Sequence, residues 1–123
     1  MSTGAKLQLR PGSRVAILGM PPDVRLDLPE GCSSTTEPAE AGAADAVIVF
    51  VAASVGLERL AGPAITAARE DRLAWLAYPK SGQLGTDINR DILARLVLHT
   101  GVQPVRQVAI DSVWSALRFR PAS

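Results

Sequence analysis

Lys80, Ser81, Thr86 and Asp87 are the residues that the sequence places best for chemistry. Lys80 and Ser81 follow a predicted strand at 73–78 (LAWLAY), and open α/β sheets bind ligands at such carboxyl ends. Thr86 and Asp87 open the next predicted helix, where the helix dipole and free N–H groups favour an anion. With Lys80 beside this helix end, the group would hold an anionic ligand. The alternative is that Thr86 or Asp87 only caps the helix, while Lys80 pairs with Asp87 or lies in solvent.

A second candidate group lies in a predicted C-terminal hairpin. Asp111 at its turn could join Lys80 at one rim, with Trp114 as an apolar wall for a flat ligand. Alternatively, Asp111 hydrogen-bonds the turn backbone and Trp114 covers the sheet. Arg118 and Arg120 share one face of the last predicted strand, and they either bind an anion or shield a solvent-facing edge.

The composition restricts the class of protein. The chain has 123 residues, 47% of them hydrophobic, which predicts a single α/β domain over 1–123 with a loose N-terminus at 1–10. Because 13 basic residues face 12 acidic ones, the net charge of +1 argues against nucleic-acid and membrane partners. Cys32 and His99 are single, which excludes a disulfide framework and a zinc site of Cys and His alone, and we expect no metal. Without a targeting segment, we expect a cytoplasmic protein.

Periodicity predicts how the chain is organised. The predicted elements are a strand at 14–18, a short strand or extended segment followed by a loop or poorly specified helix within 23–45, a strand at 46–51, a helix at 55–71, a strand at 73–78, a helix ending near 100, and hairpin strands at 105–110 and 113–120. Ser54 is the expected cap of the first helix, and Pro63 should kink it or divide it in two. The last strand alternates in polarity, which predicts a half-buried strand. This order predicts a Rossmann-like three-layer α/β sandwich whose mostly parallel sheet ends in an antiparallel C-terminal hairpin.

Segments along nearly the whole chain resemble, in order, a family of small bacterial proteins known only as a domain of unknown function. They are LRPG at 9–12, VAIL at 15–18, LPEG at 28–31, Trp75 with YPK at 78–80, TD at 86–87 with Asp91, GV at 101–102, and ID at 110–111 with WSAL at 114–117. The chain departs from the family at Tyr78, where Trp is usual, and at Ala116, where Gly is usual. Because that family has no established activity, the resemblance implies no reaction.

The order of elements also resembles the second half of the class I S-adenosylmethionine-dependent methyltransferase fold, with a shortened first half. In that fold a glycine-rich turn after the first strand lets the backbone approach the cofactor. Gly19 stands at the matching place, but Met20, Pro21 and Pro22 follow it, and proline offers no N–H donor. We therefore expect a degenerate methyltransferase-like frame with no cofactor, although Gly19 stays a candidate ligand contact.

Two main functions are compatible with these residues. The first is a non-catalytic module that binds a small ligand or a protein partner at a rim formed by Lys80, Ser81, Thr86, Asp87, Asp111 and Trp114. The alternative is a small S-adenosylmethionine-dependent methyltransferase or a related nucleotide-using transferase. A structural subunit that forms a homodimer is a third possibility. The sequence names no ligand, reaction or oligomeric state.

Overall fold

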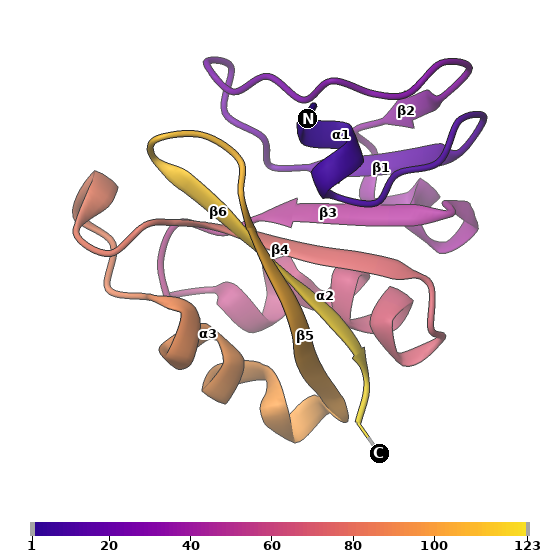
Figure 1. Cartoon of the computed structure of the whole chain (residues 1–123). Coiled ribbons are helices and arrows are strands. Elements are labelled where there is room, and N and C mark those ends of the chain that lie inside the picture. Colours follow the sequence, from indigo (N-terminus) through magenta and orange to yellow (C-terminus); the bar gives the residue numbers. More distant parts are fainter. Residues whose placement is uncertain (1, 123) are drawn as a thin grey trace.

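The computed structural model describes residues 2–122, which form one six-stranded sheet with strand order β2-β1-β3-β4-β6-β5 (Figure 1). The strands are β1 (Arg14–Leu18), β2 (Ser33–Thr35), β3 (Ala46–Phe50), β4 (Leu73–Pro79), β5 (Val102–Ala109) and β6 (Trp114–Pro121). The α-helices are α1 (Thr3–Lys6), α2 (Leu57–Arg69) and α3 (Arg90–Val97), and short 3-10 turns are η1 (Pro38–Ala43), η2 (Gln83–Gly85) and η3 (Leu98–Thr100). No helix among these residues is long and apolar enough to cross a membrane.

The sheet is parallel on one side and antiparallel on the other. β2, β1, β3 and β4 run parallel, whereas β6 pairs antiparallel with both β4 and β5. Every residue of β3 is buried, as expected for a branched apolar strand covered on both faces. The predicted mixed α/β fold, with a mostly parallel sheet and an antiparallel C-terminal hairpin, is confirmed.

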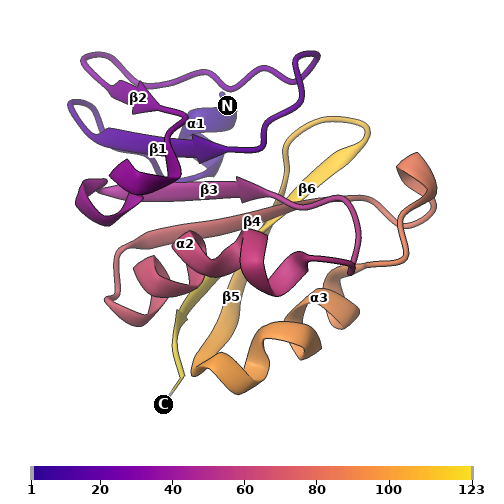
Figure 2. The same cartoon turned by 180° about the vertical axis from the view of Figure 1, so that it is seen from behind.

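The two faces of the sheet have different covers. α2 and α3 lie together on one face, in front of the sheet in Figure 2. The other face carries the four-residue helix α1 and the irregular segments around Leu9 and Val24 (Figure 1). The second face therefore has a cover made mostly of irregular chain.

The N-terminal segment is part of this cover, so our expectation of a loose N-terminus at 1–10 is wrong for residues 2–10. Leu7 is fully buried, Leu9 is nearly so, and Met1 lies outside the described residues. The indole N–H of Trp75 donates a buried hydrogen bond of 3.0 Å to the Leu7 carbonyl. The segment stays on the sheet because Leu7 and Leu9 bury apolar surface and because this bond satisfies a buried donor.

Three local predictions also need correction. Gly56, in a left-handed conformation, is the N-cap of α2 in place of Ser54. α2 continues through Pro63, so two separate helices do not form. β6 is buried on both faces at 114–117, not half-buried, because Leu117 packs into the core with α2 and Trp114 and Ala116 pack into the core on the other face. Within the weakly patterned stretch 23–45, the structure has β2 and η1.

The docking of α1 can be tested at Gly4. A Cβ at this position would lie 2.0 Å from the backbone oxygen of Asp27, so Gly4→Ala must push α1 away from the irregular cover. We expect a loss of about 1–3 kcal/mol in the free energy of unfolding, measured by urea titration. Gly42→Ala is the matched control, because no atom lies within 4 Å of its added Cβ. Equal stability of the two variants would contradict the packed N-terminus.

Candidate functional site

The predicted rim residues meet at the carboxyl edge of the sheet. Gly19 follows β1, while the loop after β4 lies beside the hairpin turn, where the Lys80 N–H donates to the Val113 carbonyl at 2.7 Å. The topology therefore brings the loop of Lys80 and the turn of Asp111 together, as the rim hypothesis requires. What remains is whether their side chains are free to bind.

Thr86 and Asp87 join two loops, and neither is the N-cap of α3. The Thr86 hydroxyl donates to the Ala52 carbonyl at 2.8 Å. Asp87 accepts the Ser54 N–H at 2.8 Å and the Ser54 hydroxyl, and these donors lower the pKa of Asp87. α3 begins after Asn89, whose side chain accepts the Ile92 N–H at 2.9 Å. The capping alternative for Thr86 or Asp87 is thus wrong, and Asn89 takes that role.

Asp111 and Trp114 have structural surroundings. Oδ1 of Asp111 accepts the N–H groups of Val113 and Trp114, at 2.8 and 2.7 Å, which closes the hairpin turn. Trp114 is only 4% exposed and packs edge-to-face on Phe50, with ring centroids 5.1 Å apart. Its ring therefore covers the sheet, and little of it is left to form a wall for a ligand.

Lys80 and Ser81 of the rim have no such structural role for their side chains among the described residues, and Gly19 is a separate candidate ligand contact. The side chains of Lys80 and Ser81 make no hydrogen bond or ion pair within residues 2–122. Gly19 has φ 74°, and a Cβ there would lie 3.1 Å from the Phe50 carbonyl oxygen. It borders a small cavity of about 230 Å³ together with Ile17, Met20 and residues 34–36.

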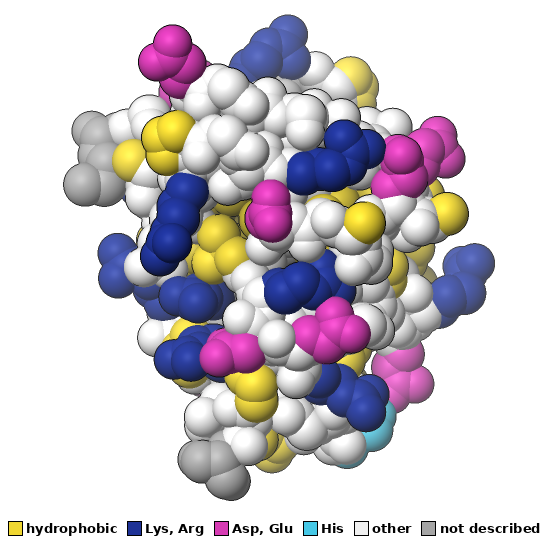
Figure 3. Space-filling view, turned by 90° about the vertical axis from the view of Figure 1, so that its right-hand side faces the viewer, with side chains coloured by type: hydrophobic (Ala, Val, Ile, Leu, Met, Phe, Trp, Pro, Cys, Tyr) yellow, Lys and Arg dark blue, Asp and Glu magenta, His cyan; other side chains and the backbone are white. Residues whose placement is uncertain are grey.

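A larger cleft, of about 610 Å³, opens at the opposite edge of the sheet, where β1, β3 and β4 begin. That volume is in the range of small-molecule sites. Its lining residues are Gln8, Arg10, Pro11, Gly12, Ser13, Asp45, Ala46, Asp71, Arg72, Leu73 and Arg118. Figure 3 shows this side of the molecule, where basic and acidic side chains surround a hollow with apolar side chains at its bottom. We call it the amino-edge cleft.

Two residues of the amino-edge cleft have a backbone conformation that favours glycine. Gln8 has φ 62° and Asp71 has φ 58°. Each follows the end of a helix, α1 or α2, and each N–H there closes the helix by bonding back to a carbonyl, Ala5 or Ala68. Glycine is usual at such positions because a side chain there costs strain. Here both side chains bind arginines of β6.

Arg118 and Arg120 are those arginines. The Arg118 Nη1 donates to the Gln8 side-chain oxygen at 2.8 Å, and Arg120 makes a bidentate pair with Asp71 at 2.9 and 3.0 Å. The hydrogen bonds from Arg120 lower the pKa of Asp71. Burial lowers the pKa of Arg118, whose Nε is buried without a hydrogen-bond partner among the described residues. Because Arg118 stays charged, the cleft wall holds a cation with spare donors.

The other charged residues of the cleft differ in how many hydrogen bonds and ion pairs they make within the protein. The Arg72 guanidinium has no free donor group to offer a ligand, because it pairs with Glu70 at 2.7 Å and donates to the Ala41 and Ala44 carbonyls. Asp45 accepts the Arg14 N–H with one oxygen, Oδ2, at 2.9 Å. The Arg10 guanidinium makes no hydrogen bond or ion pair with residues 2–122. Arg10, Arg118 and one oxygen of Asp45 therefore remain available.

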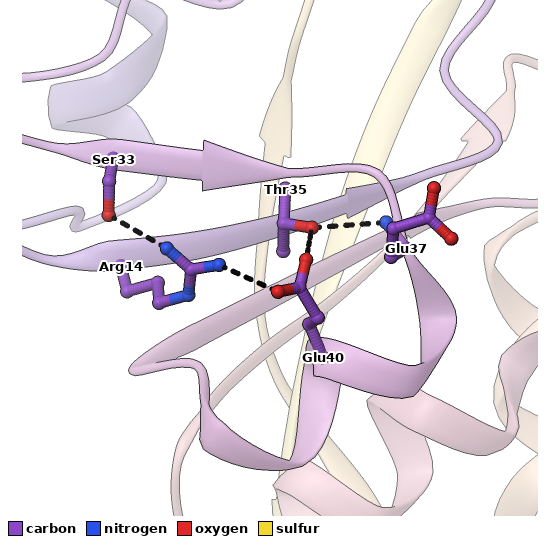
Figure 4. A network of polar contacts seen from close by, with 5 residues as sticks. All are labelled: Arg14, Ser33, Thr35, Glu37 and Glu40. Carbon is purple, nitrogen blue, oxygen red and sulfur yellow. Dashed lines mark hydrogen bonds and ion pairs between the residues drawn. The ribbon is translucent and has the colours of Figure 1, made fainter.

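A polar network beside the cleft holds the β2 edge in place (Figure 4). Arg14 donates to Ser33 at 3.4 Å and to Glu40 at 3.2 Å, and Glu40 accepts the hydroxyl of Thr35. Thr35 in turn accepts the Glu37 N–H at 3.1 Å. These bonds tie η1 and β2 to β1, and the side chains of Arg14, Ser33, Thr35 and Glu40 are all hydrogen-bonded within the protein.

Comparison with known proteins assigns no family to this chain: no family model and no curated protein matches it. Nor do the described residues include a group of three or more His, Cys, Asp or Glu side chains that could hold a metal ion. The assignment of a site therefore depends on the geometry of the cleft.

Sequence reasoning missed most of this cleft. It considered Arg118 for an anion but placed it on a solvent-facing edge, and it did not consider Gln8, Arg10 or Asp71. A usable signal was the charged residue at the end of α2, where glycine would be expected. The Gln8–Arg118 contact spans 110 residues, and nothing local indicates it.

The two hydrogen bonds that Asp87 accepts from Ser54, which we call the Asp87 clamp, predict an effect of pH on stability. Because folding lowers the pKa of Asp87 below its usual 3.8, its contribution is present above pH 3.8 and is lost as pH falls through the folded-state pKa. In Asp87→Asn, the melting temperature should therefore decrease less than in the wild type as the pH falls below about 4. Asp91→Asn is the control, because the Asp91 side chain is exposed on α3. If the melting temperature of Asp87→Asn falls with acid as steeply as that of the wild type, the clamp is contradicted.

Two substitutions of Asp71 separate the cost of its left-handed backbone from the contribution of its ion pair with Arg120 to stability. Asp71→Gly relieves the left-handed strain and Asp71→Ala keeps it, while both remove the exposed pair with Arg120. We expect the melting temperature of Asp71→Gly to equal or exceed that of the wild type, and that of Asp71→Ala to lie below both. A melting temperature of Asp71→Gly below that of the wild type would mean that the ion pair outweighs the strain.

Proposed function

We propose that this chain is a non-catalytic module that binds a small anionic ligand in the amino-edge cleft. The observation that carries the proposal is Arg118, whose guanidinium lines the cleft with its Nε buried and unpartnered among the described residues. A buried donor without a partner costs about 1–3 kcal/mol, and the Nε–Nη2 edge of a guanidinium is suited to a carboxylate or phosphate. To bind a ligand, this edge of Arg118 must turn toward the cleft that the residue lines.

Arg10 supports the same ligand charge. Its exposed guanidinium lies on the wall formed by the N-terminal cover and is free of protein partners among residues 2–122. Two arginines without an acidic partner among the described residues raise the local concentration of anions in the cleft, even though the whole chain has a net charge of only +1.

Binding is favoured over catalysis because the carboxylates of the cleft are held by hydrogen bonds within the protein, and Asp71 is a poor general base. Both oxygens of Asp71 are held by Arg120, which moves its pKa further from neutrality. Asp45 already accepts a backbone N–H. Asp71 is therefore not tuned to move protons at neutral pH, and both carboxylates can instead orient a ligand.

The other sequence-based hypotheses remain predictions beside this one. They are the Rossmann-like three-layer frame, the likeness to the uncharacterised bacterial family, a cytoplasmic location, a protein partner or homodimer, and a rim site at Lys80 and Ser81. Support for a methyltransferase comes from Gly19 and its cavity, but about 230 Å³ is below the usual volume of small-molecule sites.

The proposal is tested by melting temperature with inorganic phosphate, sulfate, citrate and glutarate. An anion at 100 times its dissociation constant adds about 2.7 kcal/mol of stability, which a domain of this size shows as several degrees. Arg118→Gln and Arg10→Gln should each weaken binding about tenfold, since a hydrogen bond to a charged group contributes about 1.5 kcal/mol or more.

Arg95→Gln is the matched control, because Arg95 is exposed on α3 and lies outside the cleft lining. It should bind anions as the wild type does. A shift with S-adenosylmethionine but with none of the anions would favour the methyltransferase alternative, and no shift with any compound would overturn the proposed function.

A further inference from the structure

The charges that the protein leaves uncompensated in the amino-edge cleft define its ligand more closely. Arg72 is neutralised by Glu70, and Asp71 is neutralised by Arg120. What remains is two cations, Arg10 and Arg118, and one anion, Asp45. A complementary ligand carries two anionic groups and one cationic group.

We propose that the amino-edge cleft binds a zwitterion of the acidic amino-acid class, an inference that rests on the proposed function. One carboxylate would accept hydrogen bonds from Arg118 and the second from Arg10, as charge-assisted pairs. The ammonium group would donate to Oδ1 of Asp45, because Oδ2 already accepts the Arg14 N–H. Every charged group of ligand and cleft would then have a partner.

The order of these groups along the sheet fits such a ligand. Arg10 precedes β1, Asp45 precedes β3, and Arg118 belongs to β6, which lies one strand beyond β4. The sheet edge thus presents positive, negative and positive charge in sequence. Neighbouring strands are about 4.8 Å apart, so the backbones of β1 and β6 are about 14 Å apart, and arginine side chains extending inward can reach the two ends of one small molecule.

The remaining lining agrees with an aliphatic body. Pro11, Ala46 and Leu73 are apolar, and the hydroxyl of Ser13 and the amide N–H₂ of Gln8 are further donors. The Gln8 oxygen is occupied by Arg118, so its amide group presents donors to the cleft. More donors than acceptors face the ligand, which again matches a molecule with two carboxylates.

The experiment is isothermal titration with four probes: L-glutamate, glutarate, L-glutamine and inorganic phosphate. Glutarate lacks the ammonium group, and glutamine lacks the second carboxylate. In the wild type, L-glutamate should bind about tenfold or more tightly than either, because each of them lacks one charge-assisted contact. This comparison needs no variant, so it stands even if a substitution harms folding.

Two variants then assign the ammonium group and the second carboxylate of the ligand to their residues. Asp45→Asn should remove the advantage of L-glutamate over glutarate, and Arg10→Gln should remove its advantage over L-glutamine. Asp27→Asn and Arg95→Gln, which alter exposed residues outside the cleft lining, should keep both advantages. Retention of the glutamate–glutarate gap in Asp45→Asn would overturn the assignment.

The outcomes of the titrations distinguish a failure of the zwitterion proposal from a failure of the proposed anion-binding function. Equal or tighter binding of glutarate or phosphate would overturn the zwitterion and leave the anion-binding module in place. If none of the four probes binds, and sulfate and citrate also fail, both proposals are overturned. Tightest binding of L-glutamate with the two variant-specific losses would support both.

Discussion

The cover of the second sheet face by the N-terminal segment is the interaction on which the amino-edge cleft depends. Leu7 and Leu9 bury their side chains against the sheet, and Trp75 fixes the Leu7 carbonyl through its indole N–H. Gln8, between these two leucines, is therefore held exposed, where it meets Arg118. Without this cover, the cleft would lose one wall, and Arg118 would be an ordinary exposed arginine.

The two helix ends beside the cleft show how backbone and side-chain requirements compete. At the ends of α1 and α2, glycine would satisfy the left-handed backbone with less strain, yet Gln8 and Asp71 stand there. Each side chain holds one arginine of β6. Strained residues are concentrated at functional sites, and here the strain and the spare arginine donors occur in the same cleft.

The sequence predicted the elements correctly where a run of residues is continuously buried. It was misleading where contacts between distant residues determine the local structure. The runs at 14–18, 46–50 and 73–79 are branched and apolar, so their strands could be predicted from local pattern alone. Asp87 and Asn89 are both good helix caps, and the choice between them depends on Ser54, 33 residues before Asp87. The same holds for the N-terminal cover, whose apolar residues show no helical or strand period long enough to indicate packing.

The contrast between the two sheet edges explains why the usual expectation for α/β proteins does not select the site here. Ligands commonly bind at the carboxyl ends of parallel strands, because the loops there offer free donors. In this chain those loops bind one another: Asp87 holds Ser54, Thr86 holds Ala52, and Asp111 closes the hairpin. Polar groups satisfied within the protein have little binding capacity left. The amino edge keeps a cation with an unpartnered donor among the described residues, and spare hydrogen-bonding capacity, more than topology, indicates where a ligand would be held.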